Sequence, residues 1–402
     1  MGLLIRGGTL LDGTGAEPIA QGAVLIEDKQ IVAVGTENDI GVVNGHQTLD
    51  VEGGTIIPGL INLHDHLHRR MIRYPRPSWS YRLHSREIES EADSFLVLQA
   101  AHNQLIQLRS GVTTVRDVGC RSHMMVDLRR SIEEGVLPGP RLLVAGNSIS
   151  MTGGHGASHR EVDGVDEVRK AAREQLRAGA DFLKLMATGG ILNFPDEDPG
   201  NVELSEAEMR AAIEEAHKVN RKVTAHAHAA RGIKNAIRAG IDCIEHGSFL
   251  DDEAIEMFLE HEVVLDPTLS GIWRYTMYER EAGNVELADV LVEHAIEPGR
   301  ANVRRAIEAG VTIGVGTDSA GIVAEEIELL AELGMSAMDC LVAATQNSAK
   351  ALGLLDRIGT LEPGKAADVA VLGSSPLDDI RAFYDVKWVL KDGVLFEGQI
   401  VH

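Results

Sequence analysis

The chain has 402 residues, and its 61 acidic against 38 basic side chains give a formal net charge of −23. Because nucleic acids and anionic membranes require a basic face, this charge excludes both as partners. The three cysteines, Cys120, Cys243 and Cys340, are isolated in the sequence, which excludes a disulfide framework and a cysteine zinc site. A signal peptide and a run of eighteen apolar residues are missing, so we expect a cytoplasmic protein.

The two ends of the chain share one pattern of short apolar runs separated by turns. Residues 2–55 contain such runs at 3–5, 23–26 and 31–34, and the pattern returns at 368–372 and 386–390. Lys391-Asp392-Gly393 is typical of a hairpin turn. We therefore predict a small β-sandwich domain formed from both chain termini, residues 1–57 and 358–402. The alternative is two unrelated edge hairpins.

Residues 58–357 instead alternate apolar strands with helical periodicity. The predicted strands are 56–63, 112–118, 141–145, 182–186, 223–227, 243–245, 263–265 and 311–316. The predicted helices are 91–109, 126–134, 165–178, 205–219, 232–239, 252–260 and 287–309. Such repetition over this length predicts an α/β fold, a (β/α)8 TIM barrel, whose active site lies at the carboxyl ends of its strands.

Metal-compatible side chains stand at the ends of five of these strands. They are His64 and His66 on the first, Lys184 on the fourth, His226 on the fifth, His246 on the sixth and Asp318 on the eighth. Histidines at i and i+2 of a strand face the same side, and imidazole nitrogens suit a zinc ion. Each residue alone has a structural explanation, but six such groups at one end of a barrel predict a metal centre.

Lys184 lies in the apolar stretch 181–190, where an ammonium group is costly to bury. An ammonium group cannot bind a cation, so a lysine beside a metal must be neutralised or chemically changed. Burial lowers the pKa of a lysine and exposes a nucleophilic amine. Reaction with CO2 gives a carboxylated lysine, an anionic ligand that can bridge two metal ions. The alternative is a lysine ion-paired to Asp318 with no second metal.

With these residues the chain resembles the amidohydrolase superfamily. It is most similar to the imidazolonepropionase-like branch, which contains Xaa-Pro dipeptidases and Xaa-Arg/Lys carboxypeptidases. The resemblance covers nearly the whole chain, from 58–66 to 364–368. Between them it is carried by the segments 150–156, 184–190, 226–228, 244–247 and 316–319.

The resemblance implies a site with two divalent metal ions, for which zinc is expected. His64, His66 and Asp318 would hold the more buried ion, and His226 and His246 the other. Carboxylated Lys184 and a hydroxide would bridge the two ions. That hydroxide would attack the amide carbon, and Asp318 would move the proton to the leaving nitrogen. His226 is preferred over His228 because its position after Val223-Thr224 matches the family.

The resemblance also indicates where the substrate binds. His155, in a glycine-rich loop, is expected near the carboxylate end of a substrate, and His228 near the substrate as well. After the segment matching Pro267-Thr268-Leu269 the family has a tyrosine, and Tyr275 is the candidate for it here. Alternatively, Trp273 forms a flat hydrophobic wall of the substrate site. The loop 69–86 holds six arginines that could attract a carboxylate or form a subunit contact.

We therefore expect a binuclear zinc hydrolase of dipeptides or N-acyl amino acids, acting on a small-molecule substrate that bears a carboxylate. A homo-oligomer is implied by the resemblance alone. One alternative is a mononuclear cyclic-amide hydrolase or deaminase, although single-metal relatives generally lack a lysine at position 184. Another is a phosphoester or lactone hydrolase. A non-catalytic barrel that binds a ligand would be expected to have lost one or more of the six groups, and all six are present.

Overall fold

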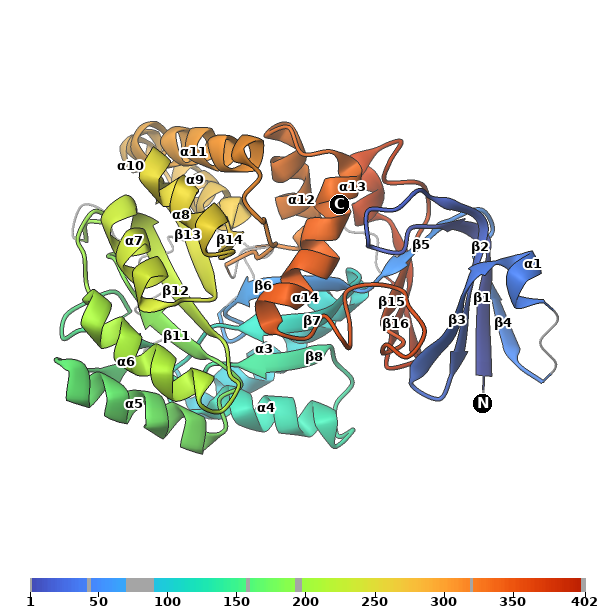
Figure 1. Ribbon diagram of the computed structural model, residues 1–402, viewed down its shortest axis with the longest axis horizontal. Coiled ribbons are helices and arrows are strands. Elements are labelled where there is room, and N and C mark those ends of the chain that lie inside the picture. The colour runs from blue at the N-terminus through green and yellow to red at the C-terminus, as the bar shows by residue number, and fades with distance from the viewer. Residues whose placement is uncertain are drawn as a thin grey trace.

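The computed structural model describes residues 2–41, 45–69, 90–156, 160–191, 197–318 and 321–398. Two bodies lie side by side along the long axis, a sheet of mostly antiparallel strands and a larger α/β region whose helices surround parallel strands (Figure 1). Within the described residues, no helix combines the length and apolar character needed to cross a membrane.

Strands from both ends of the chain form a single eight-stranded sheet, ordered β17-β16-β15-β5-β1-β2-β3 with β4 paired to β1. Its amino-terminal strands are β1 (Gly2–Leu10), β2 (Ile19–Glu27), β3 (Gln30–Thr36), β4 (Gln47–Asp50) and β5 (Thr55–Pro58). Its carboxyl-terminal strands are β15 (Val369–Leu372), β16 (Val386–Lys391) and β17 (Val394–Glu397). The two groups meet where β15 runs antiparallel to β5, so the terminal segments depend on one another for their hydrogen bonds.

The predicted hairpin at Lys391-Asp392-Gly393 is confirmed. Lys391 pairs with Val394, and the two residues between them have positive φ angles of 49° and 74°. That combination is the geometry of a two-residue turn whose twist matches the flanking strands, and it explains the Asp-Gly pair.

The α/β region contains two parallel sheets. One is β6 (Leu60–Asp65), β7 (Val112–Asp117) and β8 (Arg141–Val144). The other, ordered β10-β9-β11-β12-β13-β14, holds β9 (Ile149–Ser150), β10 (Arg160–Glu161), β11 (Leu183–Met186), β12 (Val223–Ala229), β13 (Cys243–Phe249) and β14 (Val264–Asp266). The predicted α/β class is confirmed, whereas the sheet pairing by itself gives two sheets in place of one closed barrel.

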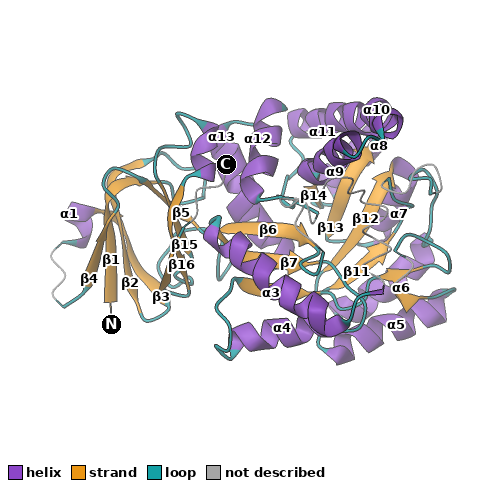
Figure 2. Cartoon of the chain, turned by 180° about the vertical axis from the view of Figure 1, so that it is seen from behind, coloured by secondary structure: helices purple, strands orange, loops and turns teal. Residues whose placement is uncertain are grey.

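Helices cover the outside of these sheets (Figure 2). After α1 (Glu37–Ile40) they are α3 (Asp93–Arg109), α4 (Met124–Glu133), α5 (Val165–Ala178), α6 (Glu206–His217), α7 (Ala230–Ala239), α8 (Asp252–Glu260), α9 (Leu269–Glu281), α10 (Val285–Leu291), α11 (Glu297–Ala309), α12 (Val323–Glu332), α13 (Ala337–Val342) and α14 (Ser348–Leu352). Two π-helical turns, Val292–Ile296 and Ala343–Asn347, and a 3₁₀ helix at Ile380–Tyr384 complete the set. The helices α9, α12, α13 and α14 were not predicted.

Three predicted elements differ in detail from the structure. The strand predicted at 56–63 is interrupted at Gly59, where an added Cβ would lie 2.2 Å from the Thr113 side chain, and its halves join different sheets. The helix predicted at 287–309 contains a π-helical turn just before Pro298, which cannot donate a backbone hydrogen bond.

The third difference is the strand predicted at 311–316, which makes only a β-bridge from Ile313 to Leu265. Gly314 and Gly316 lie in this segment because an added Cβ would contact neighbouring side chains, and glycine weakens regular strands. Backbone hydrogen bonds nevertheless connect the segment to both sides, from Gly314 N to Leu265 O at 2.8 Å and from Leu63 N to Val315 O at 2.8 Å.

Candidate metal centre

The carboxyl ends of the parallel strands bring the predicted ligands together. His64 lies on β6 and His66 directly follows that strand, Lys184 lies on β11, His226 on β12 and His246 on β13. Asp318 follows the 311–316 segment, whose backbone is tied to β6 by hydrogen bonds from Thr317 N and Asp318 N to the carbonyl of His64. All of these side chains are buried or nearly so.

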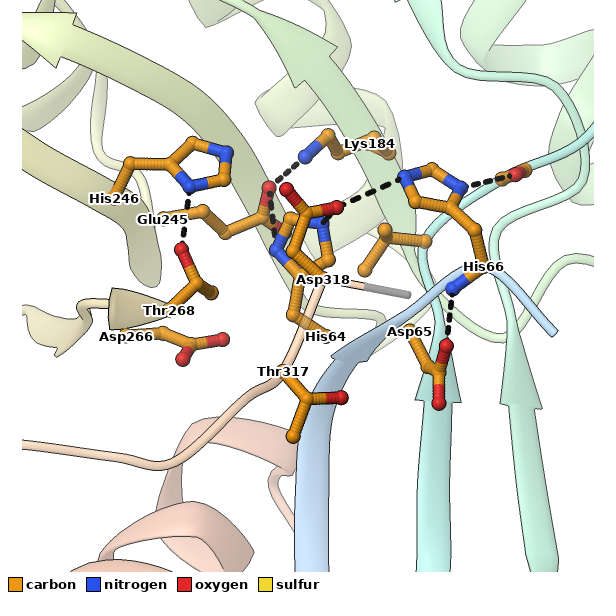
Figure 3. A network of polar contacts seen from close by, with 12 residues as sticks. His64, Asp65, His66, Lys184, Glu245, His246, Asp266, Thr268, Thr317 and Asp318 are labelled. Atoms are coloured by element: carbon orange, nitrogen blue, oxygen red, sulfur yellow. Dashed lines mark hydrogen bonds and ion pairs between the residues drawn. The ribbon is translucent and has the colours of Figure 1, made fainter. Parts of the chain in front are cut away.

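The first group that could hold a cation consists of His64, His66 and Asp318 (Figure 3). Oδ1 of Asp318 lies 3.3 Å from Nε2 of His64 and 3.8 Å from Nε2 of His66. Nδ1 of His66 donates to the carbonyl of Gly119 at 2.8 Å. That bond places the proton on Nδ1 and leaves the Nε2 lone pair for a cation.

The second group consists of His226, His228 and His246, whose ring nitrogens also lie close enough to hold one ion. The ring centroids of His226 and His246 are 4.6 Å apart, and that of His246 is 5.1 Å from that of His64. The two groups are therefore neighbours. Because His226 and His228 both offer a nitrogen to this group, the geometry is compatible with either as a ligand.

The protonation states suit cation binding. Burial lowers the pKa of His64 to about 4 and the pKa values of His66, His226 and His246 well below the usual value, so these imidazoles are neutral. Burial acts to raise the pKa of Asp318, but His64, through its charge and its hydrogen bond, together with nearby cations leaves that pKa below its usual value. Neutral imidazoles beside an ionised carboxylate fit a zinc-like cation.

Lys184 lies on β11 and is fully buried. Its ammonium group contacts Oε2 of Glu245, so the alternative in which Lys184 pairs with Asp318 has the wrong partner. Burial is the main cause that lowers the pKa of Lys184, to about 7. A substantial fraction of neutral amine is therefore present at neutral pH, as reaction with CO2 requires.

Glu245 is the main residue of this centre that sequence reasoning missed. It is fully buried, its Oε2 lies 3.5 Å from Nδ1 of His64, and it forms a third possible cation group with His64 and His246. Arg116 lies 3.7 Å from Glu245 and 3.6 Å from the equally buried Asp266. The available signal was an acidic residue inside the apolar strand 243–249.

Three residues of the centre have left-handed backbone conformations, namely His246 with φ 73°, Thr268 with φ 49° and Asp318 with φ 49°. Non-glycine residues adopt this region at a cost of about 1–3 kcal/mol, and such strain is concentrated at functional sites. The surrounding structure must therefore hold these strand ends in place.

His155 is brought to the centre from the loop after β9. Its ring stacks on that of His226 with centroids 4.2 Å apart. Nδ1 of His155 lies 2.7 Å from Oε1 of Glu197, and its backbone N–H donates to Glu203 at 2.6 Å. His228 is positioned by a 3.0 Å contact from Nδ1 to Oγ of Ser248. Of the two predicted substrate-binding histidines, His155 thus adjoins the second group, and His228 is a member of it.

Tyr275 and Trp273 occupy different surroundings on α9. Tyr275 is buried in an apolar cluster with Ile272 and Leu291. Trp273 is 41% exposed and, with His246, lines a small cavity whose described walls do not include Tyr275. Residues 70–86 of the arginine-rich loop lie outside the described residues.

Comparisons with known proteins agree with this geometry. The model of the amidohydrolase family matches residues 55–401. Ochratoxinase of Aspergillus niger is 32% identical over 432 residues, covering 98% of this chain and 86% of that protein.

Solved structures are similar over essentially the whole chain. A Xaa-Pro dipeptidase with bound methionine has a TM-score of 0.85 at 29% identity, covering 99% of this chain and 100% of that one. A prolidase complexed with N-methylphosphonate-L-proline has a TM-score of 0.88 at 29% identity with the same coverage. The A. niger ochratoxinase structure has a TM-score of 0.85 at 28% identity, covering 100% of this chain and 96% of that one.

Proposed function

The chain belongs to the amidohydrolase family and is a metal-dependent hydrolase. We propose that it cleaves amide bonds with two divalent metal ions, which we expect to be zinc. One observation carries the proposal. The group of His64, His66 and Asp318 is a neighbour of the histidine group around His246. Lys184 contacts Glu245, which itself forms a possible cation group with His64 and His246.

In this proposal His64, His66 and Asp318 hold one ion, and His226 and His246 hold the other. After carboxylation Lys184 would be a ligand for both ions. In that reaction the Nζ lone pair of the neutral amine bonds to the carbon of CO2, one C–O π bond opens to give an anionic oxygen, and the nitrogen releases its proton to water. Bound divalent ions supply a water of lowered pKa, polarise the amide carbonyl and stabilise the developing negative charge.

Asp318 is proposed to move the proton. Its Oδ1 faces the imidazoles of His64 and His66, so the other carboxylate oxygen can accept a proton from the attacking water and deliver it to the leaving nitrogen. The low pKa of Asp318 keeps the carboxylate ionised and ready to accept that proton at neutral pH.

We infer a substrate with a carboxylate next to the scissile amide, a dipeptide or N-acyl amino acid. Support comes from the neighbouring prolidases and from ochratoxinase, together with His155, which Glu197 holds beside His226. We propose that the imidazole of His155, held by this contact, hydrogen-bonds the substrate carboxylate.

We also infer that the parallel strands form one closed (β/α)8 barrel over 58–357, beside a small domain of residues 1–57 and 358–402. Three backbone connections support closure. They run from Asp181 N to Val144 O at 2.8 Å, from Gly314 N to Leu265 O and from Leu63 N to Val315 O.

The test is the metal content of protein purified with bicarbonate and without chelator, measured by inductively coupled plasma mass spectrometry. We expect two divalent ions per chain in the wild type, loss of at least one in Lys184→Ala, and no loss in Lys234→Ala, whose lysine pairs with surface carboxylates. Hydrolysis of a dipeptide and N-acyl amino acid library then tests the substrate class.

A mononuclear centre is the second candidate, because Glu245 contacts Lys184 and would hold it as an ammonium ion. One ion per chain that added metal and bicarbonate cannot raise to two would overturn the binuclear proposal. Cyclic amides and aminated rings would then be the substrates to assay first.

A further inference from the structure

Glu326, on α12, is a fully buried carboxylate outside the groups assigned to metal ions. Its two oxygens accept hydrogen bonds from the backbone N–H groups of Leu269 at 2.8 Å and Ser270 at 2.7 Å. These residues begin α9, where N–H groups have no partner within the helix. Glu326 therefore caps α9 from a different helix.

The residue directly before α9 is Thr268, which the structure holds in a conformation that a β-branched residue rarely adopts. Its hydroxyl donates to the carbonyl of Pro267 at 2.8 Å. A hydroxyl has a single proton, and when that proton is donated to Pro267, Oγ1 of Thr268 accepts from Nδ1 of His246 in their 2.6 Å contact. Figure 3 shows this contact between His246 and Thr268. The arrangement leaves the Nε2 lone pair of His246 available for a cation, as its role as a ligand requires.

The same start of α9 also lies against Asp318. A Cβ added to Gly271 would be 2.9 Å from the Cβ of Asp318 and 3.1 Å from the carbonyl oxygen of Thr317. Any shift of the first turn of α9 would therefore reach both His246, through Thr268, and the backbone that presents Asp318.

We propose that Glu326 is a positioning residue for the metal centre: by holding the first turn of α9 it fixes Thr268, and through Thr268 it fixes the tautomer and orientation of His246. The inference rests on the proposed function, which assigns His246 to the second ion. According to this inference, the affinity for that ion depends on Glu326, a carboxylate on α12 that is not itself a ligand.

The test is zinc binding to the full chain in bicarbonate buffer, measured by competition with a chromophoric chelator. In Glu326→Gln, an amide nitrogen meets one of the two backbone N–H groups, and in Thr268→Val the hydroxyl is lost at nearly constant shape. We expect each variant to bind one of its two zinc ions about 10–100-fold more weakly, the range seen when the partner of a metal-binding histidine is removed. Thr268→Ser, which retains the hydroxyl, should bind both zinc ions with most of the wild-type affinity.

The double variant Glu326→Gln/Thr268→Val separates a shared path from two independent effects. If Glu326 acts through Thr268, the double variant should lose no more affinity than the more affected single variant, whereas multiplied losses would overturn the proposal. The matched control is Asp242→Asn. Its carboxylate accepts a backbone hydrogen bond from Val223 at the amino end of β12, whereas His226 lies further along that strand, so stability can fall while both ions stay tightly bound.

The outcomes also distinguish this inference from the proposed function. Wild-type protein that binds a single ion would overturn the proposed function. Wild-type protein that binds two, with unchanged affinities in Glu326→Gln, would overturn only the role of Glu326. If Glu326→Gln does not fold by circular dichroism, Glu326→Asp provides the same comparison with the carboxylate withdrawn by one methylene group, and unchanged affinities there overturn the proposal too.

Discussion

The Lys184 side chain contacts the carboxylate of Glu245 at the centre of the site, where both residues are almost completely buried (Figure 3). Glu245 also lies 3.7 Å from Arg116, which is itself 3.6 Å from Asp266. Two carboxylates and two potential cations are therefore enclosed together beneath the ligands, where each charge depends on the others.

We expect Glu245→Gln to destabilise metal-free protein by about 1–3 kcal/mol, because it leaves Lys184 without this partner and Arg116 with Asp266 as its remaining carboxylate. Lys184→Met should also destabilise, and the double variant should lose clearly less than the sum of the two losses, since it removes both charges of the pair. Urea unfolding of chelator-treated protein measures this difference. Additive losses would show that the Lys184–Glu245 contact does not contribute to stability.

Asp318→Asn should keep much of the metal and lower the turnover number by about 10²–10⁴, the contribution of general acid–base catalysis. The amide oxygen can still face the two histidines, but it cannot take up a proton. Metal content and turnover are measured on the same preparation. A variant that holds both ions with near-normal turnover would contradict the role of Asp318.

His155→Ala should raise the KM for an amide that bears a carboxylate by about 10–100-fold, the equivalent of losing one charge-assisted hydrogen bond of roughly 1.5–3 kcal/mol. The KM for the matching substrate with a carboxamide in that place should change much less. Glu197→Gln should shift KM in the same direction by a smaller factor, since Glu197 only holds His155. His123→Ala is the control, because His123 contacts Gln175.

Stability should depend on pH through Glu215, which joins α5 to α6. Hydrogen bonds from Arg173, Lys218 and Arg169 hold the pKa of Glu215 far below its usual value. A carboxylate with a lowered folded-state pKa stabilises the fold above its unfolded pKa of about 4.3, and that stabilisation is lost as the pH falls further. The difference in unfolding free energy between wild type and Glu215→Gln should therefore be larger at pH 7 than at pH 4, with the wild type the more stable protein. A difference independent of pH would exclude this linkage.

Much of the site was predictable because its chemistry is local in sequence. Two histidines at i and i+2 of a strand face one side whatever surrounds them, so His64 and His66 could be paired from the sequence. The alternation of strands and helices indicated which residues end strands, and Lys184 stood out because an apolar strand does not tolerate an isolated charge.

Other features depended on contacts between distant segments. Glu245 became part of the centre because β13 lies beside β12 and carries its side chain toward Lys184. Glu326 accepts hydrogen bonds from Leu269 and Ser270 at the start of α9, which are 57 and 56 residues away in the sequence. No local sequence pattern predicts these bonds. The residue types at the strand ends were enough to indicate the kind of chemistry. Only the tertiary structure decided which buried charges are paired and which residues hold the ligands, because burial and hydrogen-bond partners are set by chain segments far apart in sequence.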